Sequence, residues 1–415
     1  MGLFCRKYTI MKIKRHCLLI LFLAQTTISH AQTTDTLTIQ SKIFGQSRKL
    51  KIILPARYNE YPNTNRQYMV AFLFDAQSEY FFNVNKTTID YLIAEGYLQP
   101  LIVVGIASDN RQYEFTPKAE TEEGLKNFQK SGGADLLALH LKEEALPAIH
   151  NKYRCIAYTI GIGHSLGATF VTYSLVRFPE LFNAIIAVSP NFHYDKEQMV
   201  HKFDSLGNNK NLNHKFLYMA YGFGDNYEEK FKPATKKMDS LLQKKNIAGL
   251  RWQVKSLDND SHGTTALEGI FKGLVALNRQ FTLSDDQIEA FYNDKSKPFI
   301  EHVKDYYKSV SDWAGLQLPG VDIINNMGYN CFYSDRLKEA IEVFQWGLSV
   351  YPDDINLYDS MGEIQQNTGD KKSALAFYLK GLAVVKKQQS KFDNITYKNL
   401  ISGFEGRIKS LDNPK

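Results

Sequence analysis

Short apolar runs alternate with longer amphipathic stretches from residue 32 to about residue 286. The runs are rich in β-branched and aromatic residues, and several contain no polar position, as in strands that are covered on both faces of a sheet. Strands are predicted at 50–55, 68–75, 101–107, 155–163, 184–190, 215–222 and 250–257. Helical patterns lie between them, for example over 133–153 and 167–179. This alternation predicts an α/β fold with a mostly parallel central sheet.

Residues 287–415 have helical periodicity and no strand pattern. Comparison of this region with itself gives a repeat of 34 residues, in which the matches are Met327-Gly328 with Met361-Gly362, Ala340 with Ala374, Phe344 with Tyr378, and Gly347-Leu348 with Gly381-Leu382. This period, with small residues where two helices would approach closely, resembles the tetratricopeptide repeat. We therefore expect an α/β domain over 32–286 and a smaller all-α, tetratricopeptide-like domain over 287–415. The tail could bind a protein or peptide partner, or serve only for packing.

The amino-terminal segment indicates export. Residues 1–31 contain five basic residues and no acidic one, an apolar run over 17–24, and the small residues Ser29 and Ala31 before a cleavage position. The apolar run is shorter than the roughly 20 residues that span a bilayer. We expect 1–31 to be a signal peptide, with an uncleaved anchor as the alternative and either Met1 or Met11 as the start. The mature chain would be periplasmic or secreted and have no membrane span.

Charge and cysteine content exclude several classes of function. The formal charge of +6 arises mostly in the leader, because removing its five basic residues from 50 leaves 45, against 44 acidic ones. This balance gives no indication of a nucleic-acid partner. After the leader only Cys155 and Cys331 remain, in separate predicted domains, so a disulfide is not indicated. No cysteine or histidine has metal-ligand spacing, and we expect neither a metal nor a cofactor.

The stretch YTIGIGHSLGATF, residues 158–170, has two interpretations. A dinucleotide cradle needs G-x-G-x-x-G, but here the third glycine comes one position late, and a Gly-Lys-Ser/Thr ending is also missing. A nucleophile elbow needs G-x-S-x-G between a strand and a helix, and Gly163 to Gly167 match it at such a place. The elbow makes Ser165 the candidate nucleophile. The main-chain N–H of Leu166 would then help to stabilise an oxyanion.

A serine nucleophile needs a base, and in elbow folds the chain order is serine, acid, histidine. His262 lies in a polar loop after the last predicted strand, where the base is expected. Asp225, just past the strand at 215–222, is the candidate acid that would contact the outer ring nitrogen of His262. Glu228 and Glu229 are reserves for that role. A second oxyanion donor would come from the main chain of Gln77, or of Ala76, after the strand at 68–75.

Several segments together resemble the esterase family of α/β-hydrolases that includes S-formylglutathione hydrolase, enterobactin-type siderophore esterases, feruloyl esterases and the mycobacterial antigen 85 proteins. The matching segments are GQSRKLKIILPARY, FLFDAQSEYF, LIVVGIASDNRQYEFTP, GGADLLALHLKEEALPAIHNKYR, IGHSLGATFVTYSLVRFPELFNAIIAVSPNF and SHGTT. The resemblance implies an α/β-hydrolase fold with Ser165, His262 and Asp225 as the triad. It also implies that Arg111 and the loop with Phe192 and His193 line the substrate cleft.

The chain departs from the family pattern at three places. Ala168 stands where a second glycine is usual, Asn191 and Phe192 where tryptophan is common, and Ala76 where the oxyanion loop commonly has glycine. The last two concern the identity of the substrate. We expect a carboxylic ester hydrolase that works through an acyl-enzyme on a small-molecule ester, of siderophore or carbohydrate-linked type. The alternatives are an acyltransferase or thioesterase on the same triad, and an inactive scaffold that binds a partner through its helical tail.

Overall fold

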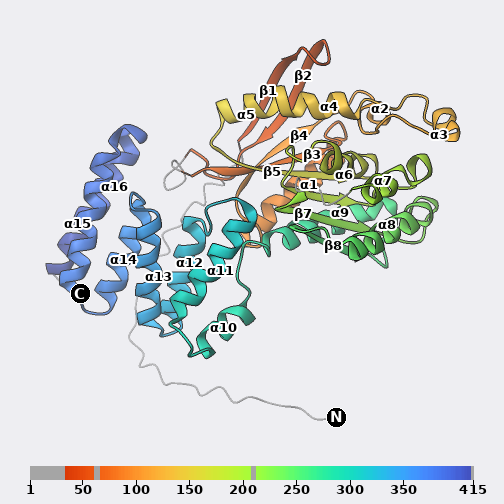
Figure 1. The fold of residues 1–415 in the computed structure, drawn as a ribbon. Helices are drawn as coiled ribbons and strands as arrows, with labels where there is room; N and C mark the ends of the chain where they lie inside the picture. The colour runs from red at the N-terminus through yellow and green to blue at the C-terminus, as the bar shows by residue number, and fades with distance from the viewer. Residues whose placement is uncertain (1–32, 60–65, 207–211, 413–415) are drawn as a thin grey trace, which may run out of the picture. The chain divides into compact units, whose positions relative to one another are not determined.

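The computed structural model describes residues 33–59, 66–206 and 212–412 (Figure 1). The predicted signal peptide lies outside the described residues. One sheet has the strand order β1-β2-β4-β3-β5-β6-β7-β8. β1 and β2 are antiparallel to their neighbours, and β3 to β8 are parallel to one another. The strands are β1 Thr34–Ser41, β2 Gln46–Ile53, β3 Tyr68–Phe74, β4 Leu101–Ile106, β5 Cys155–His164, β6 Ala184–Val188, β7 Lys215–Tyr221 and β8 Leu250–Ser256.

The α/β prediction with a mostly parallel sheet is confirmed, and the seven predicted strands correspond to β2–β8. β1 was not among the predicted strands; it is an edge strand whose side chains alternate between exposed and partly buried. Its sequence TDTLTIQS contains only two apolar residues, Leu37 and Ile39, because an edge strand packs little of its surface. β1 pairs along its whole length with β2, from Thr34 opposite Ile53 to Ser41 opposite Gln46.

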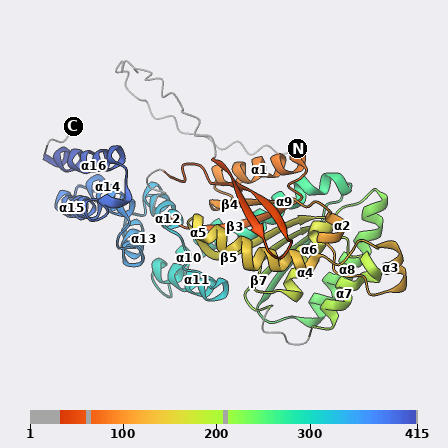
Figure 2. The same cartoon turned by 90° about the horizontal axis from the view of Figure 1, so that it is seen from above.

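Helices cover both faces of the sheet (Figure 2). α1 and α9 contribute buried side chains to the cluster on one face, and α4, α5, α6, α7 and α8 contribute to the cluster on the other. The bounds are α1 Glu79–Ala94, α2 Arg111–Glu114, α3 Glu122–Asn127, α4 Ala134–His140, the π-helix η2 Leu141–Ala145, α5 Leu146–Lys152, α6 Leu166–Arg177, α7 Tyr194–Asp204, α8 Asn226–Lys245 and α9 His262–Asn278.

The central strands are buried on both faces, which explains their continuous apolar sequences. In β3, Val70, Phe72 and Phe74 belong to one cluster, while the alternate residues Ala71 and Leu73 belong to the other. All five are fully shielded from solvent. The parallel strands therefore form a rigid platform, and their carboxyl ends place the loops that follow β3, β5, β7 and β8 at one edge of the sheet.

The rest of the chain is helical, as predicted. The helices are α10 Asp285–Asn293, α11 Phe299–Ala314, α12 Val321–Tyr333, α13 Leu337–Val350, α14 Ile355–Asn367, α15 Lys371–Lys387, the 3-10 helix η4 Gln389–Lys391 and α16 Asn394–Asp412. A Cβ at Gly328 would come within 2.5 Å of Phe344, and one at Gly362 within 2.3 Å of Tyr378. These two close contacts are 34 residues apart, which agrees with the repeat; the tetratricopeptide assignment and the domain boundary at 286 stay predictions.

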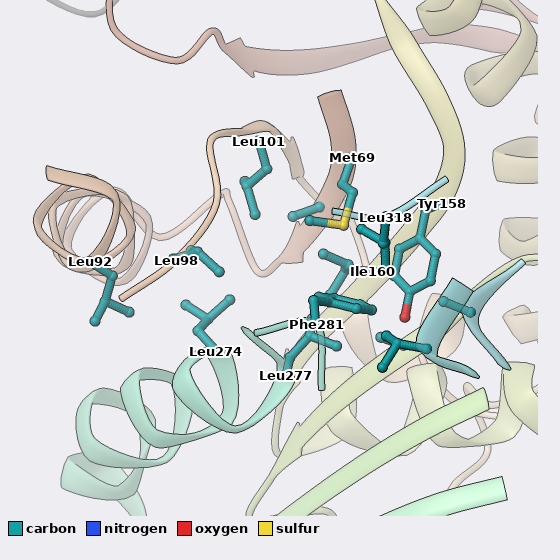
Figure 3. Packing of buried hydrophobic residues seen from close by; sticks show 14 of the residues in the cluster. Met69, Leu92, Leu98, Leu101, Tyr158, Ile160, Leu274, Leu277, Phe281 and Leu318 are labelled. Carbon is teal, nitrogen blue, oxygen red and sulfur yellow. The ribbon is translucent and has the colours of Figure 1, made fainter. Parts of the chain in front are cut away.

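One hydrophobic cluster joins the sheet to the first of these helices. In Figure 3, Met69 of β3 and Tyr158 of β5 lie close to Phe281 and Leu318, which come after α9 and α11. The Trp313 indole N–H of α11 also donates to the main-chain oxygen of Gly249, at 3.2 Å. The described residues from 33 to 412 accordingly belong to a single compact unit.

Candidate active site

Ser165 lies in a sharp turn between a strand and a helix. β5 ends at His164 and α6 begins at Leu166, so Ser165 is the N-cap residue of α6, with φ 56° and ψ −117°. Positive φ costs a non-glycine residue about 1–3 kcal/mol, and residues under such strain cluster at functional sites. The main-chain N–H of Ser165 donates to the oxygen of Val188 at 3.0 Å, which ties the turn to β6. The strand–turn–helix geometry predicted from the sequence is therefore present.

The glycines around Ser165 have different duties. A Cβ at Gly163 would lie 2.3 Å from the main-chain carbon and oxygen of Gly167, and backbone cannot move aside cheaply. A Cβ at Gly167 would meet only the Oδ2 of Asp75, at 3.3 Å, and a neighbouring side-chain carbon at 3.4 Å. Gly161 allows close packing instead, since its Cβ would lie 3.0 Å from Phe182. Gly163 is thus the position at which the turn requires glycine.

His262 contacts a carboxylate through its outer ring nitrogen. His262 is the first residue of α9, and its Nδ1 lies 2.8 Å from Oε1 of Glu228. Glu228 is fully buried, and its Oε2 accepts the main-chain N–H of Gly222 at 2.7 Å. Burial would raise the pKa of Glu228, but hydrogen bonds from His262, Ser189 and the Gly222 N–H outweigh it and hold the pKa below its ordinary value. Glu228 is therefore an ionised partner that selects the tautomer of His262 with a proton on Nδ1.

The prediction that Asp225 contacts the ring is wrong. Asp225 is the N-cap residue of α8, and its Oδ1 accepts the main-chain N–H groups of Tyr227 and Glu228, both at 2.9 Å. Its Oδ2 accepts the main-chain N–H of His262 at 2.6 Å. The short side chain is occupied by the helix terminus, while Glu228, three residues later on the first turn, reaches the ring. Aspartate followed three residues later by glutamate at the start of a helix is a capping pattern, and this signal was present in the sequence.

Three further rings surround the imidazole of His262, whose side chain is 15% exposed. The ring of His164 lies 4.5 Å from it, centroid to centroid. The ring of Tyr227 stacks on it at 5.1 Å, and Phe231 meets it edge-on at 5.4 Å. Because His164 immediately precedes Ser165, this packing places His262 next to the elbow. The predicted base thus contacts the residue that precedes the predicted nucleophile, although the two are nearly one hundred positions apart in the chain.

The two main-chain groups predicted as oxyanion donors come from adjacent loops. Leu166 is the first residue of α6, so its N–H has no acceptor within the helix. In the loop after β3, the N–H of Ala76 already donates to the oxygen of Ile106 at 3.0 Å, which removes Ala76 as the alternative to Gln77. A Cβ built on Gly167 would lie only 3.3 Å from Oδ2 of Asp75, so the two segments lie close together. The roles of Leu166 and Gln77 stay predictions.

Arg111 holds the loop that carries Gln77. Its Nε and Nη2 donate to Oδ1 and Oδ2 of Asp75 at 2.8 and 2.9 Å, a bidentate pair that fixes a residue with φ 65°. The Gln77 side chain also donates to Asp75 Oδ1, at 2.8 Å, and accepts the N–H of Ser108 at 3.1 Å. The Arg111 side chain remains 40% exposed. Direct contact with substrate, as the resemblance implied, stays a prediction.

The loop after β6 presents one of its two predicted cleft residues to solvent. His193 is exposed at the start of α7. The prediction for Phe192 is wrong, because its side chain is fully buried in the core beneath this loop, in the same cluster as Met199 and Phe203. Phe192 therefore supports the loop from below and has no surface with which to contact a substrate.

Within residues 33–59, 66–206 and 212–412, no group of three or more histidine, cysteine, aspartate or glutamate side chains is arranged to hold a metal ion. Over the same ranges, none of the helices combines the length and the apolar character needed to cross a bilayer.

Residues 41–271 match the family described as Putative esterase, which amounts to more than half of the chain. The chain belongs to this esterase family. The match begins at the end of β1 and ends within α9, so it includes Ser165, Glu228 and His262. Family membership supports an ester hydrolase, and the roles of individual residues rest on the geometry described above.

Known proteins similar to this esterase-family chain include siderophore esterases. The ferri-bacillibactin esterase BesA of Bacillus subtilis is 26% identical over 180 residues, which cover 39% of this chain and 62% of that protein. An IroE-like serine hydrolase from Shewanella oneidensis superposes with a TM-score of 0.64 at 20% identity, covering 77% of this chain and 100% of the other. An uncharacterised protein from Capnocytophaga ochracea gives a TM-score of 0.60 at 16% identity, covering 92% of this chain and 99% of the other. At these identities the structural matches show the fold.

Proposed function

We propose that this protein is a serine hydrolase that cleaves carboxylic esters, with Ser165 as nucleophile, His262 as base and Glu228 as the acid that orients the base. The observation that carries the proposal is the 2.8 Å contact between Glu228 Oε1 and His262 Nδ1 beside the strained turn at Ser165. With a proton on Nδ1, the Nε2 of the imidazole is unprotonated and can accept the proton of a hydroxyl.

The reaction would proceed in two steps. The Oγ of Ser165 attacks the ester carbonyl carbon while its proton passes to His262 Nε2, and the carbonyl electron pair moves to the oxygen. The tetrahedral intermediate then expels the alcohol, which takes the proton from His262 and leaves an acyl-enzyme. A water molecule, deprotonated by the same histidine, cleaves the acyl-enzyme to release the carboxylic acid and restore Ser165.

The main-chain N–H groups of Leu166 and Gln77 would stabilise the oxyanion. Removal of one such donor typically costs about 2.7–4 kcal/mol of transition-state stabilisation. Arg111 supports this through its bidentate contact with Asp75, two residues before Gln77. The imidazolium that forms on His262 would be stabilised by the buried carboxylate of Glu228.

We propose a siderophore-type ester with an aromatic acyl group as the first substrate class to test. Its support is the similarity to the ferri-bacillibactin esterase and the exposure of two tyrosines near the site. Tyr80, in the first turn after the Gln77 loop, is 93% exposed, and Tyr227, stacked on His262, is 61% exposed. Exposed aromatic rings can stack on an aromatic acyl group. A carbohydrate-linked aromatic ester is the second class, since it presents a similar group.

Hydrolysis of p-nitrophenyl butyrate by the purified chain tests the proposal, together with labelling by a fluorophosphonate probe. Ser165→Ala is expected to abolish labelling and reduce turnover to background. Ser205→Ala, an exposed serine after α7, is the matched control and is expected to behave as wild type. Turnover or labelling that survives in Ser165→Ala contradicts the proposal.

A panel of esters then separates the substrate classes and the type of acyl transfer. Ferric and metal-free catecholate triesters, feruloyl sugar esters and acetylated sugars would be compared by kcat/KM. Added short-chain alcohols would reveal acyl transfer, because a transferase passes the acyl group to the alcohol in preference to water. A siderophore-type assignment fails if the catecholate esters are turned over no faster than p-nitrophenyl butyrate.

A further inference from the structure

His164 links the residue before the nucleophile to the main chain of the base. Its ring lies between Phe81 of α1, at a centroid distance of 6.2 Å, and His262, at 4.5 Å. Its Nε2 is 2.8 Å from the main-chain oxygen of His262 and 3.3 Å from Oγ1 of Thr265. The G-x-S-x-G motif allows any residue at this position, so the motif alone assigns no role to His164.

The partner of Nε2 determines the protonation of His164. A carbonyl oxygen can only accept a hydrogen bond, so Nε2 carries a proton and donates it to His262 O. Burial, followed by the neighbouring His262, lowers the pKa of His164 to about 4, so the ring is neutral at ordinary pH. A neutral donor holds the carbonyl without placing a positive charge beside the histidine that must itself become positive during the reaction.

The same carbonyl oxygen accepts a second side chain. Thr265 Oγ1 donates to His262 O at 2.8 Å, and Ser189 Oγ lies 2.8 Å from Thr265 Oγ1. On the other side of the residue, the N–H of His262 donates to Asp225. Both main-chain groups of the base are therefore held by side chains, and its ring is held separately by Glu228.

We propose that His164 is a positioning residue for catalysis: its Nε2–H group holds the main-chain carbonyl of His262 and so sets the place of the base relative to Ser165. The inference rests on the proposed function of Ser165 and His262. The link is direct, because His164 is the end of β5 and Ser165 follows it in the elbow. A shift of the base by about 1 Å can reduce the rate by roughly a hundredfold, so a side chain that fixes this distance affects kcat.

Three variants of His164 separate the hydrogen bond from the packing. His164→Gln keeps an N–H group near the place of Nε2, His164→Asn is polar but too short to reach the carbonyl, and His164→Leu fills space without a donor. The control is His140→Leu, which removes a buried histidine of α4 whose partner is Glu144. Each variant would be assayed for kcat and KM with p-nitrophenyl butyrate, and for fluorophosphonate labelling, after circular dichroism and thermal melting confirm folding.

The expected result is a loss of kcat of roughly 10- to 100-fold in His164→Leu and His164→Asn, with KM changed less than about twofold. His164→Gln should keep most of the wild-type kcat, and His140→Leu should lose stability without loss of kcat. If His164→Leu does not fold, the comparison of the glutamine and asparagine variants decides the question.

If the wild-type protein is active and labelled, two outcomes would overturn this inference and leave the proposed function intact. In the first, the leucine or asparagine variant keeps the kcat of the wild type. In the second, the glutamine variant loses as much kcat as the asparagine variant. A wild-type protein with no turnover and no serine labelling would instead overturn the proposed function, and the inference with it.

Discussion

The carboxylate of Glu228 lies 2.8 Å from Nδ1 of His262 and is fully buried. Asp225 lies three residues earlier, at the N-cap of α8. Its carboxylate accepts a hydrogen bond from the main-chain N–H of the same histidine, His262. Two carboxylates from one helix terminus thus hold two different parts of the candidate base. The two carboxylates have different roles, because only Glu228, which contacts the ring, can stabilise the positive charge that forms on the ring.

Glu228→Gln is expected to reduce kcat by up to about 10⁴-fold, because an amide cannot stabilise the imidazolium and can favour the wrong tautomer. Asp225→Asn should cost far less, about tenfold at most, since asparagine is an equally good N-cap residue. Glu229→Gln, an exposed neighbour paired with Lys232, is the control and should be silent. Steady-state kinetics with p-nitrophenyl butyrate measure the three. A larger loss for Asp225→Asn than for Glu228→Gln would return the acid role to Asp225.

The position of both acids could be predicted from the sequence, because each follows a strand at the carboxyl edge of a parallel sheet. The choice between them could not be made from chain order alone. It depends on the direction of the Asp225 side chain, which turns to the N–H groups of Tyr227 and Glu228. The capping pattern in the sequence indicated that the Asp225 side chain could bind the helix terminus instead of the histidine ring. Only the geometry shows that it does so.

Gly163→Ala is expected to destabilise the protein or prevent its folding, because its methyl group would lie 2.3 Å from the main chain of Gly167. Overpacking a well-packed site typically costs about 1–3 kcal/mol, and here the obstacle is backbone. Gly167→Ala meets its neighbours at 3.3 and 3.4 Å and should be milder. Chemical unfolding and fluorophosphonate labelling of both variants test this order. Equal stability of the two variants would show that the turn can relax around a methyl group at position 163.

Arg111→Gln is expected to reduce kcat more than it raises KM, because the bidentate pair with Asp75 is lost and the Gln77 loop is no longer fixed. The loss should be roughly tenfold or more, in line with the effect of a misplaced oxyanion donor. Arg177→Gln, on the outer part of α6 and 61% exposed, is the matched control. A rise in KM with unchanged kcat would instead show that Arg111 acts by binding the substrate.

The hydrophobic pattern predicted the parallel strands because these strands are covered on both faces of the sheet. Residues such as Phe72 and Phe74 are fully buried, and such strands contain few polar residues. The pattern failed for β1, whose half-exposed surface carries little apolar signal. It could not place Phe192 either, because an aromatic residue in a loop is compatible with a cleft wall and with a buried support. The resemblance supplied the cleft interpretation, and the full burial of Phe192 corrects it.

The pH dependence of stability provides a test of the environment of His164 that requires no substrate. Its pKa is about 4 in the folded chain, lowered by burial and by His262, against an ordinary value near 6.5 in the unfolded chain. Between these values the unfolded chain binds more protons, so stability is fully present above about pH 6.5 and is lost as the pH falls towards 4. At about 1.4 kcal/mol per unit, the loss attributable to His164 is up to about 3 kcal/mol.

His164→Gln removes this titration and retains the other groups that respond to acid, such as Glu144 and His140. As the pH falls from 7 to 4.5, the free energy of unfolding of the wild type should therefore decrease more than that of His164→Gln. Urea unfolding at a series of pH values measures both free energies. A difference between them that stays constant across this range would mean that His164 titrates alike in the folded and unfolded chains, and that its ring is not held neutral against His262.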